Sequence, residues 1–447
     1  MSRFARPRGT RDFGPAEMAT RRWLEASLRE SARRFGFGEV ATPIFEHTDL
    51  FRAKSGPNVI DEIYAFQDKG ERDICLRPEL TAPVMRFYLE ALTREPKPLK
   101  FFYYGPCYRY EEPQEGRYRE FWQFGTELIG PSGPDADAEV IALAHACIAQ
   151  TGLRDFILHV GHIGLLRALV ARLEASDADK ATTFRLIDKD SPELRDHLAK
   201  LGASDALAEA IIGIAHHEAS IDLRDATAIA DYLDTARALL SNALAGDAEA
   251  ADHAEAALVA FGRTLRLVGA RGVATCHADL GVARGLDYYT GIVFELEAPQ
   301  LGAQKQIGGG GAYTLAEVFG GQPTGSAGFG LGFDRILLAL EREDRVPTPR
   351  VAVDVAFATI GDEAAIRAVE LATALRADGL AVATDLMGRN VKKALQHAGK
   401  LGARLVVIAG DKELADGVVT LRDMATAEQM SVAVDSLLAE VQKRLAA

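Results

Sequence analysis

The stretch Tyr104-Gly-Pro-Cys-Tyr-Arg-Tyr-Glu-Glu-Pro-Gln-Glu-Gly-Arg-Tyr-Arg-Glu-Phe-Trp-Gln123 joins two β-prone aromatic segments through a turn-forming Pro/Gln/Gly segment. This pattern predicts a long hairpin over residues 101–127. Its first strand carries Arg109 and its turn carries Arg117, while Gln123 and Glu127 on the return strand are spaced to share one face. Such a face favours a polar-substrate site over a dry core, because each buried charge needs its own partner.

The composition is that of an ordinary globular protein, with 447 residues of which 48% are hydrophobic and 26% charged. We expect two or three domains at this length. No run approaches the roughly 18 apolar residues of a membrane helix, and the N-terminus has no apolar signal segment, which favours a cytoplasmic protein without a membrane partner. The formal net charge of −13 argues against a uniformly basic nucleic-acid-binding surface, although local basic patches remain compatible with it.

The cysteines give no sign of a metal centre. Cys75, Cys107, Cys147 and Cys276 are far apart and form no CxxC pair. This spacing indicates neither a disulfide framework nor a zinc site, and we predict no metal ligands in the chain.

Three segments precede the hairpin. Residues 6–13 are basic and turn-rich, and they suit either a phosphate-contacting arm or a solvated leader. A helix is predicted from Pro15 to a stop at Gly36. Residues 39–45 are predicted to form a strand, which Pro43 restricts to an edge or interface position. An edge strand that meets its symmetry mate would suit a homodimer.

Glu79 and Thr81 lie in a short segment between Pro78 and Pro83 that is predicted to be extended before a helix begins. Residues two apart in extended chain point the same way, so this carboxylate and hydroxyl could bind an ammonium group together. The alternative is a helix-capping Thr81 with an incidental surface Glu79.

Beyond an Ala- and Leu-rich block at 177–268, predicted to be helical, chemistry-bearing residues return. Arg284 and Tyr289 precede a β-rich run. Glycines 308–311 and Tyr313 follow, suiting either close approach to a ligand or a hairpin turn. Residues 325–340 are predicted to be a small-residue strand that leads into a helix with Arg335 near its start. This arginine would face a flat ligand, or would simply pair with an acid.

The C-terminal part alternates strands and helices after a charged linker at 341–350. Predicted strands at 351–358, 380–384, 404–409 and 417–421, with helices at 362–378, 390–401 and 432–444, indicate a small α/β domain with a mostly parallel sheet. On the second helix, Lys392 and Lys393 face outward, close to Arg389. This basic patch suits either nucleic-acid backbone contact or an ordinary solvated face.

Together these segments resemble the histidyl-tRNA synthetase family of class II aminoacyl-tRNA synthetases. Residues 40–44 resemble its motif 1, Tyr108-Arg-Tyr-Glu with Gly116-Arg-Tyr-Arg its motif 2, and Gly330-Leu-Gly-Phe-Asp-Arg335 its motif 3. Arg284-Gly-Leu-Asp-Tyr-Tyr289 is the hexapeptide that marks histidyl enzymes. The resemblance implies an α+β fold: an antiparallel sheet flanked by helices (1–176 and 269–340), a helical insertion (177–268), a linker (341–350) and an α/β anticodon-binding domain (351–447).

The resemblance also implies a function, which is ligation of L-histidine to tRNA(His) through a histidyl-adenylate, with ATP and Mg²⁺. Arg284 and Arg109 would be catalytic. ATP would be bound by Arg109, Glu111, Arg117 and Arg335. Histidine would be bound by Glu79, Thr81, Gln123, Glu127, Tyr289 and Tyr313, and the tRNA by Arg389, Lys392 and Lys393.

The chain departs from the family pattern at a few positions. Ala312 and Thr314 flank Tyr313 where the family usually has Gly-Gly-Arg-Tyr-Asp, and Glu112 and Glu115 stand where basic residues are common. These acids bear on recognition of the tRNA end. Two other hypotheses are a non-catalytic, synthetase-like regulatory subunit of ATP phosphoribosyltransferase and an RNA-binding module without chemistry.

Overall fold

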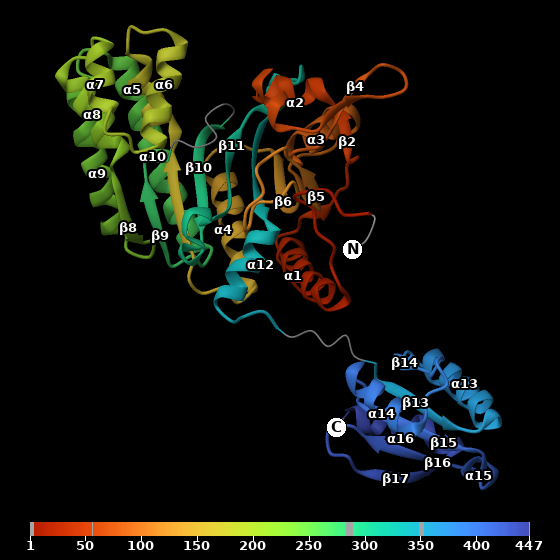
Figure 1. Ribbon diagram of the computed structural model, residues 1–447. Coiled ribbons are helices and arrows are strands. Elements are labelled where there is room, and N and C mark those ends of the chain that lie inside the picture. Colours follow the sequence, from red (N-terminus) through yellow and green to blue (C-terminus); the bar gives the residue numbers. More distant parts are fainter. Residues whose placement is uncertain (1–3, 56, 283–288, 348–352, 447) are drawn as a thin grey trace. The chain divides into compact units, whose positions relative to one another are not determined.

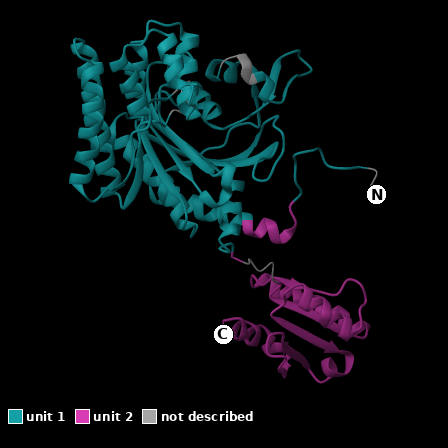
Figure 2. Cartoon of the chain, turned by 60° about the vertical axis from the view of Figure 1, so that its left-hand side comes forward, with its two compact units in different colours: residues 1–12, 21–346 teal, residues 13–20, 347–447 magenta. Residues whose placement is uncertain are grey.

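A computed structural model describes residues 4–55, 57–282, 289–347 and 353–446, and it shows two compact units, each with its own sheet (Figures 1 and 2). Unit 1 comprises residues 1–12 and 21–346, and unit 2 comprises residues 13–20 and 347–447. The fold is α+β, as predicted. No helix among the described residues is long and apolar enough to cross a membrane.

Unit 1 is built on a nine-stranded sheet, in which the predicted hairpin forms the neighbouring strands β5 (Leu99–Tyr108) and β6 (Glu120–Gly130). The strand order is β1-β5-β6-β12-β11-β10-β7-β9-β8. In the described residues every pairing of this sheet is antiparallel except β1–β5 and β7–β9. The other strands are β1 (Gly38–Glu39), β7 (Ile157–His162), β8 (Glu218–Asp222), β9 (Thr275–Asp279), β10 (Tyr289–Glu297), β11 (Gln306–Tyr313) and β12 (Gly325–Gly332).

Helix α4 (Pro134–Gln150) packs against the middle strands of this sheet and is buried along most of its length. Many of its side chains are alanine, which lets the helix lie close to the strands and to its neighbour α10 (Ala248–Ala270). Helix α1 (Pro15–Arg34) adds Leu24 and Leu28 to the same core and, as predicted, ends just before Gly36. The other α-helices that the structure describes in unit 1, outside residues 177–268, are α2 (Thr48–Ser55), α3 (Thr81–Phe87), α5 (Ile163–Ala171), α11 (Leu315–Val318) and α12 (Phe333–Arg342).

The strand predicted at residues 39–45 is wrong for most of its length. Only Gly38–Glu39 forms the edge strand β1, and residues 40–44 have no strand structure. The guanidinium of Arg77 donates hydrogen bonds to the carbonyls of Thr42 (2.7 Å) and Pro43 (3.1 Å), so a side chain takes the place of a neighbouring strand. The chain then enters a separate three-stranded sheet formed by β2 (Phe45–His47), β4 (Asp73–Leu76) and β3 (Ala65–Gln67).

The block at 177–268 is not wholly helical, contrary to the prediction. It contains the strand β8, which pairs with β9 and so extends the main sheet. Asp222 ends this strand, and the side chain of Asp225 then caps the next helix. The helices of the block are α6 (Asp177–Asp188), α7 (Leu194–Lys200), α8 (Asp205–Ala215), α9 (Ala226–Ala243) and α10.

Unit 2 has a five-stranded sheet of order β14-β13-β15-β16-β17. The prediction of a mostly parallel sheet is wrong, because β13 pairs in parallel with β14 and β15, whereas β15–β16 and β16–β17 are antiparallel. The predicted helix 432–444 begins later, because residues 429–433 form β17. The elements are β13 (Val355–Ile360), α13 (Asp362–Ala377), β14 (Val382–Ala383), α14 (Val391–Lys400), β15 (Leu405–Gly410), α15 (Asp411–Ala415), β16 (Val418–Asp423), β17 (Gln429–Ala433) and α16 (Leu437–Ala446).

Candidate active site

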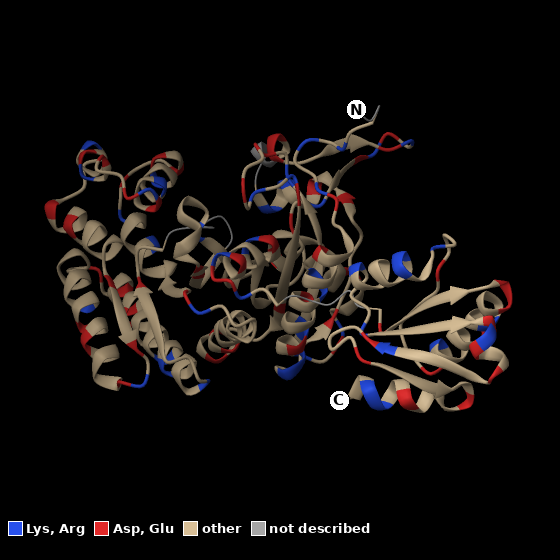
Figure 3. Cartoon of the chain, turned by 60° about the horizontal axis from the view of Figure 1, so that its bottom comes forward, with Lys and Arg blue, Asp and Glu red and all other residues tan. Residues whose placement is uncertain are grey.

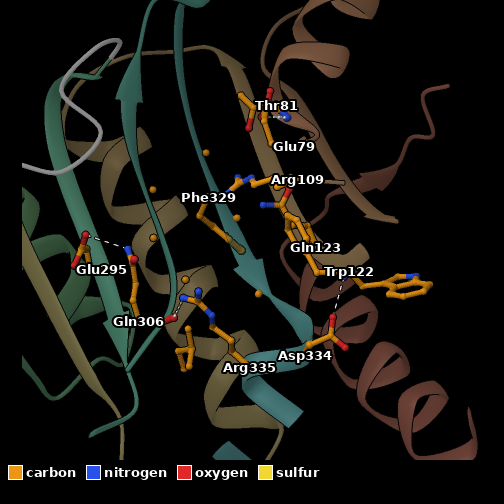
Figure 4. A pocket seen from close by; sticks show the side chains of 18 of the residues that line it. Glu79, Thr81, Arg109, Trp122, Gln123, Glu295, Gln306, Phe329, Asp334 and Arg335 are labelled. Atoms are coloured by element: carbon orange, nitrogen blue, oxygen red, sulfur yellow. Dashed lines mark hydrogen bonds between the residues drawn. The ribbon is translucent and has the colours of Figure 1, made fainter. Parts of the chain in front are cut away.

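A cavity of about 350 Å³ opens over the middle strands of the nine-stranded sheet of unit 1 (Figure 4). Its wall comes from β5, β6, β10, β11 and β12, together with the hairpin turn and the starts of α3 and α12. Figure 4 shows Glu79 and Thr81 toward one end and Arg335 toward the other. The sequence-predicted residues in the wall are Glu79, Thr81, Arg109, Glu111, Arg117, Gln123, Tyr289, Tyr313 and Arg335.

The sheet register explains why one strand of the wall must be glycine-rich. On β6, Gln123 lies opposite Gly332 and Glu127 opposite Gly328 of β12, so the two polar residues share one face as predicted. A Cβ atom added at Gly328 would collide with the carboxylate of Glu127 and the carbonyl of Thr126. Glycine at this position therefore makes room for a buried carboxylate between two strands.

Glu127 is fully buried and does not itself line the cavity; it lies behind two phenols, Tyr103 and Tyr313, that do. Tyr103 donates a hydrogen bond of 3.0 Å to one carboxylate oxygen, and Tyr313 donates a short one to the other. The hydroxyl of Tyr103 also lies 3.4 Å from that of Thr81. Tyr103 was not among the predicted site residues, although its position on β5 opposite the Gln123–Glu127 strand was a signal for it.

Burial sets the protonation of this cluster. Loss of water raises the pKa of Glu127 to about 7, against the hydrogen bonds from Tyr313, Thr81 and Tyr103, which favour the charged form. Burial also raises the pKa of Tyr103 and of Tyr313 well above the usual value for a phenol. Both phenols are therefore neutral donors at neutral pH, and they face a carboxyl group poised between its two forms.

Glu79, rather than Thr81, caps the helix at this end of the cavity. Its carboxylate accepts hydrogen bonds from the backbone N–H groups of Thr81 (2.7 Å) and Ala82 (3.0 Å), the first residues of α3. The ammonium of Lys54, only 7% exposed, lies 3.2 Å from Glu79. A cation therefore already sits beside the carboxylate that was predicted to bind an ammonium group. Lys54, on α2, was missed because this contact crosses from one element to another.

Three arginines also line the cavity; Arg335 lies toward the end away from Glu79, whereas Arg109 lies nearer to Glu79 and donates to the carbonyl of Pro78 at 3.1 Å. Arg117 pairs closely with Glu111, and Arg109 lies 4.0 Å from the same carboxylate. Arg335 donates to the carbonyls of Gln306 (2.8 Å) and Gly116 (3.1 Å). Burial, followed by the positive charges of Arg117 and Arg109, lowers the pKa of the Arg335 guanidinium. Three convergent guanidiniums, with one carboxylate among them, suit a polyanionic ligand such as a chain of phosphates.

Arg335 was also predicted to face either a ligand or an acid. It donates to carbonyl oxygens of Gly116, Gln304 and Gln306, so these contacts hold it by neutral groups and leave its charge directed at the cavity. The neighbouring Asp334 instead accepts from Arg21 (2.7 Å) and from the backbone N–H of Trp122 (3.0 Å), tying α12 to α1 and the hairpin.

The basic arm packs on the hairpin and is therefore not simply a solvated leader. Arg8 pairs with Glu112 at 2.8 Å, and Arg11 pairs with Asp334 at 2.6 Å. On the other side of the turn, Arg342 of α12 pairs with Glu115 at 3.0 Å. The two acids that depart from the family pattern thus have cationic partners within the chain.

The predicted residues still to be placed are Arg284, Tyr289 and the three cations of unit 2. Arg284 falls outside the described residues, and Tyr289 starts β10 with its ring 6.4 Å from that of Tyr313. In unit 2, Arg389 pairs with Asp385, and Lys392 and Lys393 are exposed in the first turn of α14.

Comparison with known proteins gives two family matches. Residues 9–336 match the family model described as histidyl-tRNA synthetase, and residues 354–444 match an anticodon binding domain. A histidine–tRNA ligase of Methanosarcina acetivorans is 43% identical, covering 98% of this chain and 98% of its own. One of Archaeoglobus fulgidus is 41% identical, covering 98% and 99%. The crystal structure of histidyl-tRNA synthetase from Nostoc sp. has a TM-score of 0.78 at 25% identity, covering 99% of this chain and 100% of that one.

Proposed function

The chain belongs to the histidyl-tRNA synthetase family, and from this premise we propose which residues of its cavity bind each substrate. The protein is a histidine–tRNA ligase, which joins L-histidine to tRNA(His) at the expense of ATP. Nothing in the comparisons favours the regulatory-subunit alternative, and the curated relatives named as ligases span nearly the whole chain. The observation that supports the proposal is a single cavity lined by three arginines and by two phenols that hold the buried carboxylate of Glu127.

Histidine binds at the end that contains Glu127. A neutral imidazole has one N–H donor and one nitrogen acceptor, so Glu127 accepts from the first and a tyrosine hydroxyl donates to the second: that of Tyr289, or that of Tyr313 once it releases Glu127. The amino acid's ammonium takes the place of Lys54 beside Glu79 or shares that carboxylate with it. The hydrogen bonds to Thr81 and Gln123 complete the binding of the ammonium and carboxylate.

ATP binds at the end that contains the arginines. Arg109 contacts the α-phosphate, Arg117 exchanges Glu111 for the γ-phosphate, and Arg335 holds the far side of the nucleotide. In the described residues no group of three or more His, Cys, Asp or Glu is arranged to hold a metal. A Mg²⁺ ion would be held mainly by the ATP phosphates, and Glu111 is a carboxylate that lines the cavity beside Arg117.

The two bound substrates then react in two steps. A carboxylate oxygen of histidine attacks the α-phosphorus, the bond to the β-phosphate oxygen breaks, and pyrophosphate leaves with those electrons. A terminal ribose hydroxyl of the tRNA then attacks the histidyl carbonyl and AMP leaves. Arg109, together with Arg284 as the family resemblance implies, neutralises the charge that builds up on the α-phosphate.

Unit 2 contacts the tRNA through Arg389, Lys392 and Lys393. The match of residues 354–444 to an anticodon binding domain supports this role, as does the exposure of both lysines. Cations on a surface helix bind the RNA backbone by releasing its counterions.

The protein acts as a cytoplasmic homodimer. Exposed apolar side chains at the small three-stranded sheet support the dimer: Ile44, just before β2, is 44% exposed, Phe45 of β2 59% and Phe66 of β3 48%. Exposed apolar clusters of this kind are typical of subunit interfaces. Sedimentation velocity at micromolar concentration would measure the mass directly.

The test of the function is exchange of labelled pyrophosphate into ATP, without tRNA and with or without histidine. We expect exchange only when histidine is present, followed by charging of a tRNA(His) transcript when it is added. Folded protein that catalyses no histidine-dependent exchange would contradict the activation step. Exchange without charging would contradict the transfer of histidine to the tRNA.

A further inference from the structure

A lysine side chain is buried in the wall of the cavity, next to Glu79. Figure 3 shows Lys and Arg interspersed with Asp and Glu along both units, and many of the resulting ion pairs are open to solvent, such as Arg8 with Glu112 at 70% and 79% exposed. The side chain of Lys54, by contrast, is 7% exposed and that of Glu79 14%, and Nζ lies 3.2 Å from Oε2. A buried ion pair adds little net stability, because both charges lose their water. Its place in a ligand cavity therefore points to a part in binding.

Two helices that pack against each other fix the positions of this pair. Lys54 stands in the last turn of α2, and Phe51 of the same helix is 1% exposed in a core cluster that includes Ala82 of α3. Glu79 caps α3, and its carboxylate accepts from the backbone N–H groups of Thr81 and Ala82. The lysine stem has four carbons and a head that can turn. The carboxylate is therefore held in place, while the ammonium group can reach other acceptors nearby.

Glu79 can accept the ammonium of an amino acid without losing Lys54. The contacts described for this carboxylate are two backbone N–H groups and Lys54, and they fill three of the roughly four acceptor positions that a carboxylate has. The substrate ammonium takes the fourth position and becomes a close neighbour of the lysine head. Two ammonium groups on one carboxylate repel each other unless a second anion lies beside them.

The carboxylate of the amino acid itself supplies that second anion. The ammonium and carboxylate of an α-amino acid are bonded to one carbon, so their N and O atoms lie roughly 3 Å apart. An ammonium bound to Glu79 therefore brings the substrate carboxylate next to Lys54. Without this cation the carboxylate would approach two acids, Glu79 and Glu127, which are close enough to interact electrostatically.

The reaction also brings two anions together, because the histidine carboxylate attacks the α-phosphate. Arg109, which is proposed to contact that phosphate, lies near the same end of the cavity, with Nε 3.1 Å from the carbonyl of Pro78 (Figure 4). The guanidinium fork suits a phosphate, and the compact head of Lys54 suits a single carboxylate oxygen. Each reacting anion then has a cation of its own, which removes the repulsion between them.

We propose that Lys54 binds the α-carboxylate of histidine while it keeps its contact with Glu79. The inference rests on the proposed function, and it adds a substrate contact from α2 to the histidine site. The competing role for Lys54 is structural, namely an ion pair that only holds Glu79 in position.

Two ligands that differ at the carboxylate distinguish these roles: histidine and histidinol, in which a hydroxymethyl group replaces the carboxylate. Titration calorimetry without ATP gives the Kd of each ligand for wild-type protein and for Lys54→Met, which keeps the length of the side chain but not its charge. The Kd for histidine should rise by at least about 10-fold, because a charge-assisted hydrogen bond is lost, and the Kd for histidinol by no more than about twofold. An equal rise for both ligands, or an unchanged Kd for histidine, would overturn the contact.

Lys54→Arg tests whether the charge is what matters, and it keeps the buried carboxylate paired if the methionine variant does not fold. It should retain the preference of wild-type protein for histidine over histidinol to within about fivefold. In the exchange assay, Lys54→Met should raise the KM for histidine and leave the KM for ATP unchanged. A folded arginine variant without any preference for histidine would refute the role of the charge.

Lys100 of β5 offers a matched control. It pairs with Glu139 at 2.6 Å, with side chains 28% and 21% exposed, and it is not among the described residues that line the cavity. Lys100→Met removes a partly buried lysine from an ion pair without touching the histidine site. Both Kd values should stay unchanged, and a selective loss of histidine binding in this variant would overturn a local contact at Lys54.

These measurements also keep the inference apart from the proposed function. Wild-type protein that bound neither ligand would refute the histidine site, and the Lys54 contact with it. Wild-type protein that bound histidine and catalysed exchange, without a selective loss of histidine binding in Lys54→Met, would retain the ligase function and lose the Lys54 contact.

Discussion

The two ends of the cavity are built in opposite ways. At the histidine end, Glu127, Tyr103 and Tyr313 are at most 2% exposed and are bonded to one another. At the nucleotide end, the side chains of Arg109 and Arg117 are 38% and 43% exposed, and a single carboxylate stands among them. One end is a buried set of side chains that are bonded to one another. The other end carries partly exposed arginines with one carboxylate that a ligand can displace.

This difference explains how one sheet can supply both specificity for the amino acid and charge stabilisation for the nucleotide. A buried carboxylate with too few donors is costly, so an amino acid that lacks an imidazole N–H gives Glu127 no donor beyond the two phenols. The nucleotide end needs no such discrimination, because a polyphosphate is recognised by the amount and position of positive charge. We therefore expect changes at the two ends to separate in their effects on histidine and on ATP.

The largest effect should come from Glu127→Gln. Loss of the buried carboxylate should lower kcat/KM for histidine in the exchange assay by about 1000-fold, or roughly 4 kcal/mol, because the imidazole partner is lost at the buried end. The KM for ATP should change less than about threefold. Steady-state exchange kinetics with each substrate varied in turn would measure both.

The control for this variant is Glu111→Gln, which removes a carboxylate from the other end of the same cavity. It should alter the KM for ATP and leave kcat/KM for histidine nearly unchanged. If both variants affected histidine alike, the cavity would not be divided in the way described.

The second effect is on stability, and it has a defined pH window. The pKa of Glu127 is raised from 4.5 to about 7, so its contribution to stability is full below pH 4.5 and is lost as the pH rises through 7. The cost above pH 7 is on the order of 3 kcal/mol. Gln does not titrate, so the Tm of Glu127→Gln relative to wild type should rise by several degrees between pH 5 and pH 8.

Thermal scans of both proteins at the two pH values would measure this difference, and the pH dependence shared by the rest of the chain cancels. A Tm difference that is the same at pH 5 and pH 8 would mean that Glu127 titrates normally. Ionisation of Glu127 would then add no cost to the free energy of folding.

The smallest effect should come from Arg117→Ala. It removes one exposed cation and should raise the KM for ATP by about 10-fold, or roughly 1.4 kcal/mol, without changing kcat/KM for histidine at saturating ATP. The effect should shrink as salt is added, because exposed charges are screened. Arg342→Ala is the matched control, since Arg342 pairs with Glu115 outside the cavity and its loss should leave the KM for ATP unchanged. Equal effects of the two variants would point to general charge rather than to a phosphate contact.

Much of the site was predictable because its signals are local. The alternation of aromatic and polar residues predicted the hairpin, and its period of two placed Gln123 and Glu127 on one face, opposite glycines of β12. The small-residue strand that runs into Arg335 was predicted for the same reason. The division of unit 2 into strands and helices also followed from the sequence, but its sheet is less parallel than predicted.

What the sequence did not predict depends on contacts between distant elements. Lys54 reaches Glu79 from α2, a contact that no local spacing revealed, whereas Tyr103 reaches Glu127 across the hairpin, whose strand pairing was a signal that went unused. Arg77 binds the carbonyls of residues 42 and 43, and no local pattern could show that a side chain would replace the predicted strand there. By contrast, β17 had a local signal, since Met430 and Val432 alternate with polar neighbours over residues 429–432.

We propose above all that the end of the cavity next to Glu127 selects histidine. The most direct measurement is wild-type exchange of pyrophosphate into ATP, compared between histidine and glutamine, an amino acid of similar size with an amide in place of the imidazole. The account predicts that kcat/KM for histidine exceeds that for glutamine by about 10,000-fold or more, because glutamine leaves the buried carboxylate and phenols poorly matched. A ratio below about 100, or exchange that does not depend on histidine, would contradict it.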